Sequence, residues 1–244
     1  MDFRIIQDKS TNHFNGRKGY KPDMIVSHIT SGSFDGAVSW LKNPQSKASS
    51  HFVISRKGEI RQLVDLKDGA WCNGTSVSAG KSTYYGLSTL PQVRARKTNA
   101  NYYTVSIEHE GREGIPFTEI QMEASIWLHK WIIKEIKRLY GVDIQIDREH
   151  IVGHYQINPR TKPNCPGRLF FWNKLMESLS GDTKVPSEAY TRLILLGKEV
   201  KSVVVKDSKS YVWLKGSKIM VPVRELFETL GLNVEWSKGK IEVK

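Results

Sequence analysis

Two histidines and one cysteine, far apart in the chain, have the side chains best suited to chemistry: His28, His154 and Cys165. Each histidine falls at or just past the end of a short apolar run, and Cys165 lies in the loop after the second run. Two imidazoles and one thiolate bind zinc tightly and leave the fourth tetrahedral position open, as in catalytic zinc sites. If the three residues meet, they predict a catalytic Zn²⁺ site.

Each of these residues alone also fits a structural role. A single histidine at a strand end is often only hydrogen-bonded, and a single cysteine often behaves as a small buried hydrophobe. The spacing is not that of a local zinc finger. Cys72, between Trp71 and Asn73, is assigned to this structural class.

Short β-rich runs must position these residues. They cover residues 24–29, 50–55, 60–64, 103–110 and 151–154. The second and third runs flank a polar turn containing Gly58, which predicts a hairpin. The segment 70–101 is rich in Gly, Ser, Thr and Asn, and it is expected to be a long surface loop that forms part of a binding site.

Three helices are predicted, two between these runs and one after the last run. The longest opens with a Thr118-x-x-Gln121 capping box and ends at Gly141, and the last covers residues 169–179. The first begins near Ser33 or Asp35. Its inner side is expected to carry Ala37, Val38, Trp40 and Leu41.

The composition is that of an ordinary globular protein of 244 residues, with 39% hydrophobic and 25% charged residues. No secretion signal or membrane-spanning apolar run is visible, so the chain is expected to be made in the cytoplasm or to leave by a route that reads no N-terminal signal. Two cysteines form no disulfide framework; a single bridge is the alternative, but a reducing compartment with either thiol free to bind metal is the simpler interpretation.

The formal net charge of +12 predicts an anionic partner: nucleic acid, a membrane surface or a cell wall bearing teichoic acid. The sequence has no block of lysine or arginine, no nucleic-acid-binding motif and no glycine-rich phosphate loop. Nucleic acid is therefore not expected as a partner.

Composition divides the chain into a catalytic domain (residues 1–179), a linker (180–189) and a small α+β domain (190–244). The small domain is expected to contain strands at 201–205, 211–214, 233–236 and 241–243, with a helix at 223–230.

Five motifs, in order along residues 23–175, resemble those of the type 2 N-acetylmuramoyl-L-alanine amidases, the family that includes phage lysozyme-amidases and peptidoglycan-recognition proteins. The motifs are Ile25-Val26-Ser27-His28; Ser50-His51-Phe52-Val53-Ile54 with Gly58-Glu59-Ile60; Ala70-Trp71 with Gly74; Val105-Ser106-Ile107-Glu108-His109-Glu110-Gly111; and Val152-Gly153-His154 with Pro159 and Asn164-Cys165-Pro166-Gly167.

This resemblance implies an α/β fold with a mixed central β-sheet flanked by helices, and a zinc site of His28, His154 and Cys165. It implies hydrolysis of the amide bond between N-acetylmuramic acid and L-alanine in bacterial peptidoglycan. Glu108 matches the catalytic glutamate, the general base that takes a proton from the zinc-bound water and passes it to the leaving amine. Where many members have a histidine after the tryptophan, this chain has Cys72, which is not expected to be essential to the chemistry.

Two assignments stay open. Glu110 shares a strand face with Glu108, and either carboxylate could reach the metal. The family's lysine lies two residues before the third ligand and assists at the oxyanion. The candidate here, Lys162, lies three residues before Cys165, so a charged position at the rim is the alternative. His51 is expected to be structural or to contact a ligand rather than bind the metal, and His109 to face away from Glu108. The remaining histidines, at positions 13, 129 and 150, are expected to be ordinary surface or helix residues.

Residues 219–236 resemble the copper amine oxidase N-terminal-like domain, a module often appended to bacterial wall-acting enzymes. The region has no histidine or cysteine, so no copper site is expected. The resemblance implies wall binding, with basic residues such as Lys215, Lys218 and Arg224 meeting anionic wall polymers. A stabilising or dimerising appendage is the alternative.

The lack of a visible secretion signal favours a phage or prophage endolysin, or an autolysin, that acts on the wall after release. One alternative is a recognition module that binds peptidoglycan without cutting it. Such relatives typically lose a metal ligand, whereas this chain keeps all three and the candidate base. A basic nucleic-acid-binding protein is the other alternative, and it would bind DNA in a salt-sensitive way without zinc.

Overall fold

The computed structural model describes residues 3–181, 193–195, 198–200, 234–237 and 240–243. The chain divides into two units, residues 1–182 and 183–244. Among the residues described, no helix has the length and apolarity needed to cross a membrane.

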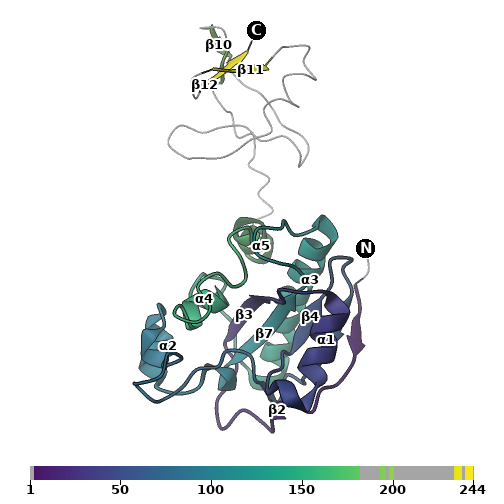
Figure 1. Cartoon of the computed structure of the whole chain (residues 1–244), viewed down its shortest axis with the longest axis vertical. Coiled ribbons are helices and arrows are strands. Elements are labelled where there is room, and N and C mark those ends of the chain that lie inside the picture. The colour runs from purple at the N-terminus through teal and green to yellow at the C-terminus, as the bar shows by residue number, and fades with distance from the viewer. Residues whose placement is uncertain (1–2, 182–192, 196–197, 201–233, 238–239, 244) are drawn as a thin grey trace. The chain divides into compact units, whose positions relative to one another are not determined.

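A six-stranded sheet forms the centre of the first unit (Figure 1). In spatial order its strands are β1 (Ile5–Gln7), β5 (Ile60–Gln62), β4 (Phe52–Ile54), β7 (Thr104–His109), β3 (Met24–Ile29) and β8 (Ile151–Gly153). Only β4 and β5 pair antiparallel, as the predicted hairpin, and the other neighbours are parallel. The predicted mixed central sheet flanked by helices is confirmed, whereas the short edge strand β1 was not predicted.

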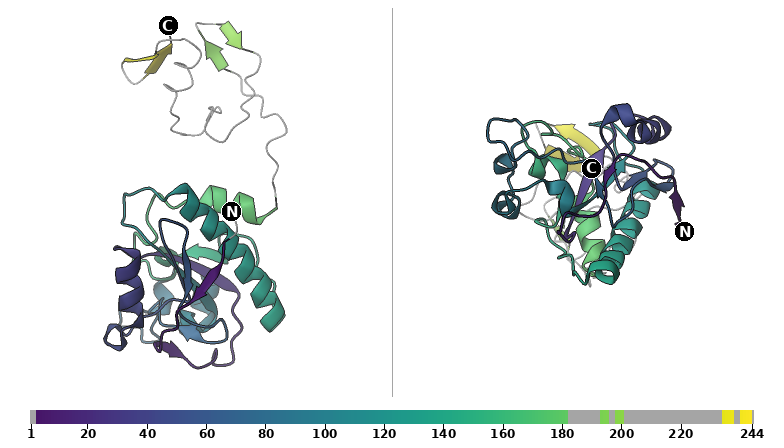
Figure 2. Two further views of the ribbon diagram at one scale, coloured as in Figure 1. Left: turned by 90° about the vertical axis from the view of Figure 1, so that its right-hand side faces the viewer. Right: turned by 90° about the horizontal axis from the view of Figure 1, so that it is seen from below.

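The sheet is buried on both faces. Side chains alternate along each strand, so successive residues of one strand pack against elements on opposite faces. Phe52 and Ile54 of β4 pack with the long helix α3 (Glu119–Tyr140) on one face. Val53, between them, packs with α1 (Phe34–Lys42) on the other face. Figure 2 shows α3 running along one side of the sheet and α1 on the opposite side.

The ends of α3 follow from its sequence. Thr118 caps the N-terminus by accepting the Gln121 amide at 3.2 Å, and Gly141 ends the helix with a φ of 69°. The predicted bounds are confirmed, but only half of the capping box forms. The Gln121 side chain instead donates to the carbonyl oxygens of Ile54 and Glu110, because it is buried against the sheet.

The inner side of α1 is Phe34, Val38 and Leu41, which follow the helical repeat. Trp40 was expected to be buried with them, and that expectation is wrong: its side chain is 56% exposed. It lies two residues after Val38, which turns it to roughly the opposite side of the helix.

The segment 70–101 is more ordered than a plain surface loop, because it contains a short helix α2 (Pro91–Arg96) that buries Val93. The last helix, α5 (Trp172–Leu179), starts later than predicted. The remaining elements of the first unit are β2 (His13–Phe14), β6 (Gly69–Ala70), α4 (His154–Ile157), and the 3₁₀ turns η1 (Pro44–Ser46), η2 (Tyr85–Leu87) and η3 (Ala100–Tyr102).

Two hairpins are described in the second unit. They are β9 (Leu193–Leu195) with β10 (Lys198–Val200), and β11 (Val234–Ser237) with β12 (Lys240–Val243). The latter pair matches the strands predicted at 233–236 and 241–243. The strands predicted at 201–205 and 211–214, the helix at 223–230 and most of the linker lie outside the described residues.

Candidate active site and metal centre

The candidate site residues meet at the carboxyl ends of three parallel strands. His28 of β3 and Glu108 of β7 are direct partners in the parallel register. On the other side of β3, β8 ends at Gly153, and His154 follows as the first residue of α4. The carboxyl ends of parallel strands lie along one edge of the sheet, and α/β proteins commonly bind their ligands at this edge.

His28, His154 and Cys165 converge, although 126 residues separate the two histidines. The Nδ1 atoms of the two imidazoles are 2.9 Å apart, and the potential ligand atoms of all three residues lie within 4.8 Å of one another. The Cys165 Sγ atom also lies 3.4 Å from the backbone nitrogen of Ile29.

Gly153 allows the Cys165 loop to approach the end of β8. A Cβ atom at Gly153 would lie 2.8 Å from the Pro166 ring and 2.6 Å from the Tyr155 ring. The Tyr155 amide donates to the Cys165 carbonyl oxygen at 2.9 Å, which fixes the loop against α4. The Gly153-His154 and Cys165-Pro166 motifs therefore belong to one packing unit.

The protonation states of these residues suit a metal. Burial lowers the pKa of His154 to about 4 and that of His28 well below its ordinary value, so both imidazoles are neutral, the form that binds metals. His154 Nε2 lies 3.3 Å from the Asn73 carbonyl oxygen. Donation there by an Nε2–H leaves the His154 Nδ1 lone pair facing His28, as in zinc sites whose outer contacts fix the tautomer.

The thiol completes a donor set that fits Zn²⁺. Burial raises the pKa of Cys165 to about 12, with a further contribution from Glu108, so the free thiol keeps its proton and loses it on metal binding. Two neutral imidazoles and one thiolate are borderline-soft donors of the kind zinc prefers.

Glu108 lies beside this donor set. Its Oε2 atom is buried and has no hydrogen-bond partner, while Oε1 lies 3.9 Å from Cys72 Sγ. Burial raises the pKa of Glu108 to about 7, opposed by the positive charge of Lys162 and by the contact with Cys72. A carboxylate of this kind can both accept and return a proton near neutral pH.

Glu110, the alternative base, has a different environment. One oxygen accepts the Phe34 amide at 3.0 Å and the other accepts the Arg56 amide at 2.7 Å. These bonds join the start of α1 to the β4–β5 turn. Glu110 does not line the cavity that contains Glu108.

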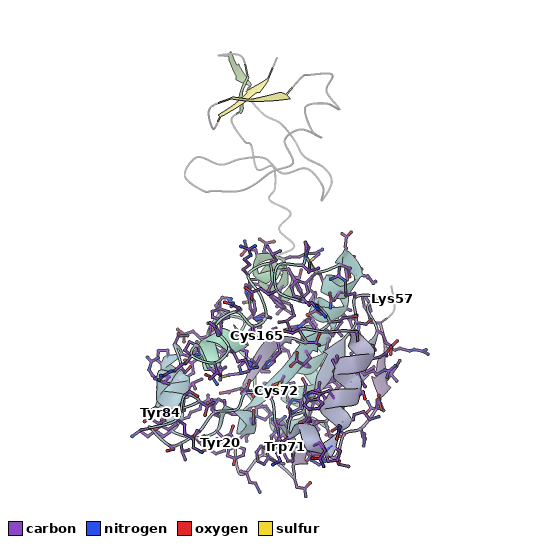
Figure 3. All side chains as sticks on the ribbon, in the orientation of Figure 1. Tyr20, Lys57, Trp71, Cys72, Tyr84 and Cys165 are labelled. Atoms are coloured by element: carbon purple, nitrogen blue, oxygen red, sulfur yellow. The ribbon has the colours of Figure 1, made fainter. Side chains whose placement is uncertain are left out.

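A cavity of about 310 Å³ encloses the site. The lining residues include the three potential ligands, Glu108, Cys72, Lys162, Trp40 and Trp71. Lys162 is exposed, as a rim position requires. Figure 3 labels Cys72 and Cys165 between α4 and α1, with Trp71 at the lower end of the domain in that view.

Cys72 is the main residue that the sequence interpretation misplaced. It is not a core hydrophobe: it lines the cavity, and its Sγ atom lies 3.4 Å from His28 Nε2. The available signal was its position directly after Trp71, within the motif formed by Ala70-Trp71 and Gly74. Trp71 and Cys72 also confirm that the segment 70–101 contributes to the site.

Two other histidines have structural contacts, as expected. His51 accepts the Ser106 amide at 3.0 Å and contacts the buried Arg17. His109 points to the α3 face of the sheet, where its Nε2 atom lies 2.8 Å from Ser125 Oγ.

Comparison with known proteins identifies similar chains. The sequence profile of the family described as N-acetylmuramoyl-L-alanine amidase matches residues 18–168. The 1,6-anhydro-N-acetylmuramyl-L-alanine amidase AmpD of Haemophilus influenzae is 30% identical over 135 residues, which cover 55% of this chain and 60% of that protein. The chain thus spans less than two thirds of that relative.

A second curated relative is N-acetylmuramoyl-L-alanine amidase A of Achromobacter lyticus. It is 25% identical over 174 residues, 64% of this chain and 82% of that protein. The crystal structure of a selenomethionine AmpD derivative shares the fold, with a TM-score of 0.53 and 20% identity over 73% of this chain and 99% of the other.

Proposed function

Because this chain belongs to the N-acetylmuramoyl-L-alanine amidase family, we propose that it is a zinc hydrolase that cleaves the amide bond between N-acetylmuramic acid and L-alanine in bacterial peptidoglycan. The observation that carries this proposal is the convergence of His28, His154 and Cys165 beside Glu108 in one cavity. A recognition module that only binds peptidoglycan has no need of a buried carboxylate next to an open metal site.

The roles of the residues follow from their positions. His28, His154 and Cys165 would hold zinc, and the bound ion would supply Lewis acidity that lowers the pKa of water and polarises the amide carbonyl. Glu108 takes the proton of the attacking water and delivers it to the leaving nitrogen. Burial raises its pKa to about 7 before metal binds, and the positive charge of a bound ion would lower it again, which favours the carboxylate form that accepts the first proton.

Lys162 is proposed to assist at the carbonyl oxygen. Its ammonium group lies at the rim of the cavity and acts electrostatically on Glu108, His28 and Cys165. A positive charge there stabilises negative charge that develops on the oxygen in the transition state. The long side chain can reach inward although its backbone lies three residues from Cys165.

The biological setting is also a proposal: an endolysin or autolysin, made in the cytoplasm, that acts on the wall after release. The net charge of +12 supports attraction to an anionic wall. Residues 190–244 are proposed to bind anionic wall polymers, although most of them lie outside the described structure.

The test is digestion of purified peptidoglycan by the full chain, with and without a chelator and added zinc, followed by mass analysis. Stem peptides that begin with L-alanine should appear, vanish on chelation and return with zinc. The name of the Haemophilus relative specifies a 1,6-anhydro-N-acetylmuramyl substrate. Soluble anhydro-muropeptides are therefore tested as a second substrate in the same assay. If the protein binds the wall but releases no stem peptides under any metal condition, the proposed amidase activity is refuted and the chain is a recognition module.

A further inference from the structure

Both ring nitrogens of His28 face potential metal ligands. Nδ1 lies 2.9 Å from His154 Nδ1, in the set that includes Cys165. Nε2 lies 3.4 Å from Cys72 Sγ, which in turn lies 3.9 Å from Glu108 Oε1. The ligand atoms of His28, Cys72 and Glu108 also lie within 4.8 Å of one another.

Two of the three separations in this second set are close to those between ligands of one zinc ion, and the third is within 4.8 Å. Tetrahedral zinc has bonds of about 2.3 Å to sulfur and about 2.0–2.2 Å to nitrogen and oxygen. These bonds hold a sulfur ligand roughly 3.5 Å from a nitrogen or oxygen ligand of the same ion. The observed 3.4 Å and 3.9 Å separations need little adjustment.

The backbone that carries Cys72 is fixed in place. The amides of Cys72 and Asn73 both donate to the buried Asn101 Oδ1, at 3.3 and 2.8 Å. The preceding amide, of Trp71, donates to Ser49 Oγ at 2.8 Å. The thiol is therefore held beside His28 before any ion binds, which lowers the cost of ordering a ligand set.

We propose that Cys72, Glu108 and the Nε2 atom of His28 form a second site for a thiophilic divalent cation, and that excess zinc fills it and inhibits the enzyme. The metal site stands on its own geometry. The inhibition rests on the proposed function, because coordination of Glu108 removes the carboxylate that serves as base.

The charges of the ligands would balance those of two divalent cations in this cavity. On binding, a second ion would displace the thiol proton of Cys72 and the Nε2 proton of His28 to solvent, and His28 would then serve both sites as an imidazolate. Two thiolates, one carboxylate and one imidazolate then neutralise two divalent cations. A buried cluster without net charge avoids most of the desolvation cost of its parts.

The test is metal binding to the full chain by equilibrium dialysis and elemental analysis over a range of free zinc. The wild type should bind two equivalents, the second more weakly. Cys72→Ala and Cys72→Ser should each lower the affinity for the second equivalent at least tenfold. Serine is the matched control, since it keeps a hydrogen-bonding group next to His28 but is a poor ligand for zinc.

Cobalt titration gives a second readout without catalysis. The first equivalent should produce thiolate-to-cobalt absorption from Cys165, and the second should increase it only where Cys72 is present. In peptidoglycan assays, excess zinc should inhibit the wild type and not the two variants, each relative to its own activity at one equivalent.

Three results would overturn the site: a wild type that binds only one equivalent, a Cys72→Ser variant that keeps the second equivalent, or cobalt spectra that do not depend on Cys72. If Ala alone weakens the first site while Ser preserves it, Cys72 merely orients His28 through a hydrogen bond. Two equivalents that depend on Cys72, in a protein without amidase activity, would support the metal site and refute the proposed function.

Discussion

Glu108 and Glu110 are separated by one residue, yet their carboxylates have opposite surroundings. Glu110 accepts the Phe34 and Arg56 amides at 3.0 and 2.7 Å. Glu108 keeps one buried oxygen without a partner, beside the candidate metal ligands. A buried polar atom left unsatisfied costs free energy, so its position next to a donor set of this kind indicates a functional rather than a stabilising role.

Glu108→Gln should remove turnover and keep the fold. Loss of a general base lowers kcat by about 10²–10⁴-fold. The melting temperature should not fall, because the change removes a charge that burial disfavours. Peptide release, zinc content and wall binding are measured together. Normal turnover would exclude Glu108 as the base and make Glu110 the next candidate.

Glu110→Gln should show the reverse pattern. Its amide NH₂ group would face a backbone N–H that now donates to a carboxylate oxygen, leaving at least one donor unsatisfied. We expect a loss of about 1–3 kcal/mol in the free energy of unfolding. Chemical denaturation measures this loss, and kcat at a temperature where the variant is folded should fall far less than in Glu108→Gln. A kcat loss equal to that of Glu108→Gln would refute this division of roles.

Cys165→Ser should weaken zinc binding at the first site. Replacement of a thiolate removes a direct ligand, so the affinity should fall by more than the roughly 10–100-fold typical of outer-shell changes. Zinc competition with a chromophoric chelator measures the change. Cys72→Ser, in the same cavity, is the control, and it should keep the first equivalent. Unchanged zinc affinity in Cys165→Ser would remove Cys165 from the site.

The sequence was sufficient wherever local signals and burial agree. The α3 helix runs between its predicted cap, Thr118, and Gly141 because capping chemistry and apolar periodicity both specify it. The hairpin around Gly58 was equally legible: its φ of 84° suits glycine, and an added Cβ would lie 2.8 Å from Ile120. The four-residue α4 helix is too short for periodicity to reveal.

The candidate site was predictable only in part, because its contacts join distant segments. Motif order identified His28, His154 and Cys165, but their separation is set by strand order and by the close approach at Gly153. The same limit applies to Cys72, whose contact with His28 spans 44 residues. The different surroundings of Glu108 and Glu110 depend on two backbone amides, one at the start of α1 and one in the β4–β5 turn, that donate to Glu110.

His129 should make the protein sensitive to acid. It is buried in α3, with Nδ1 2.7 Å from the Ser125 carbonyl oxygen and no partner for Nε2. Burial lowers its pKa to about 4, whereas an unfolded chain has the ordinary value of about 6.5. Between these values the unfolded state binds the proton more readily. The stability contributed by the neutral imidazole is therefore complete above pH 6.5 and declines as the pH falls toward 4.

His129→Leu should abolish this part of the acid sensitivity, because leucine has a similar volume and no titratable group. The decline amounts to about 1.4 kcal/mol per pH unit, or about 2 kcal/mol between pH 7.5 and pH 5. Urea unfolding of both proteins at the two pH values gives the difference between their losses. The comparison cancels the histidines remote from His129, and only His109, which shares the Ser125 hydroxyl with His129, also changes its surroundings. An equal loss in wild type and variant would show that His129 does not titrate differently in the folded and unfolded states.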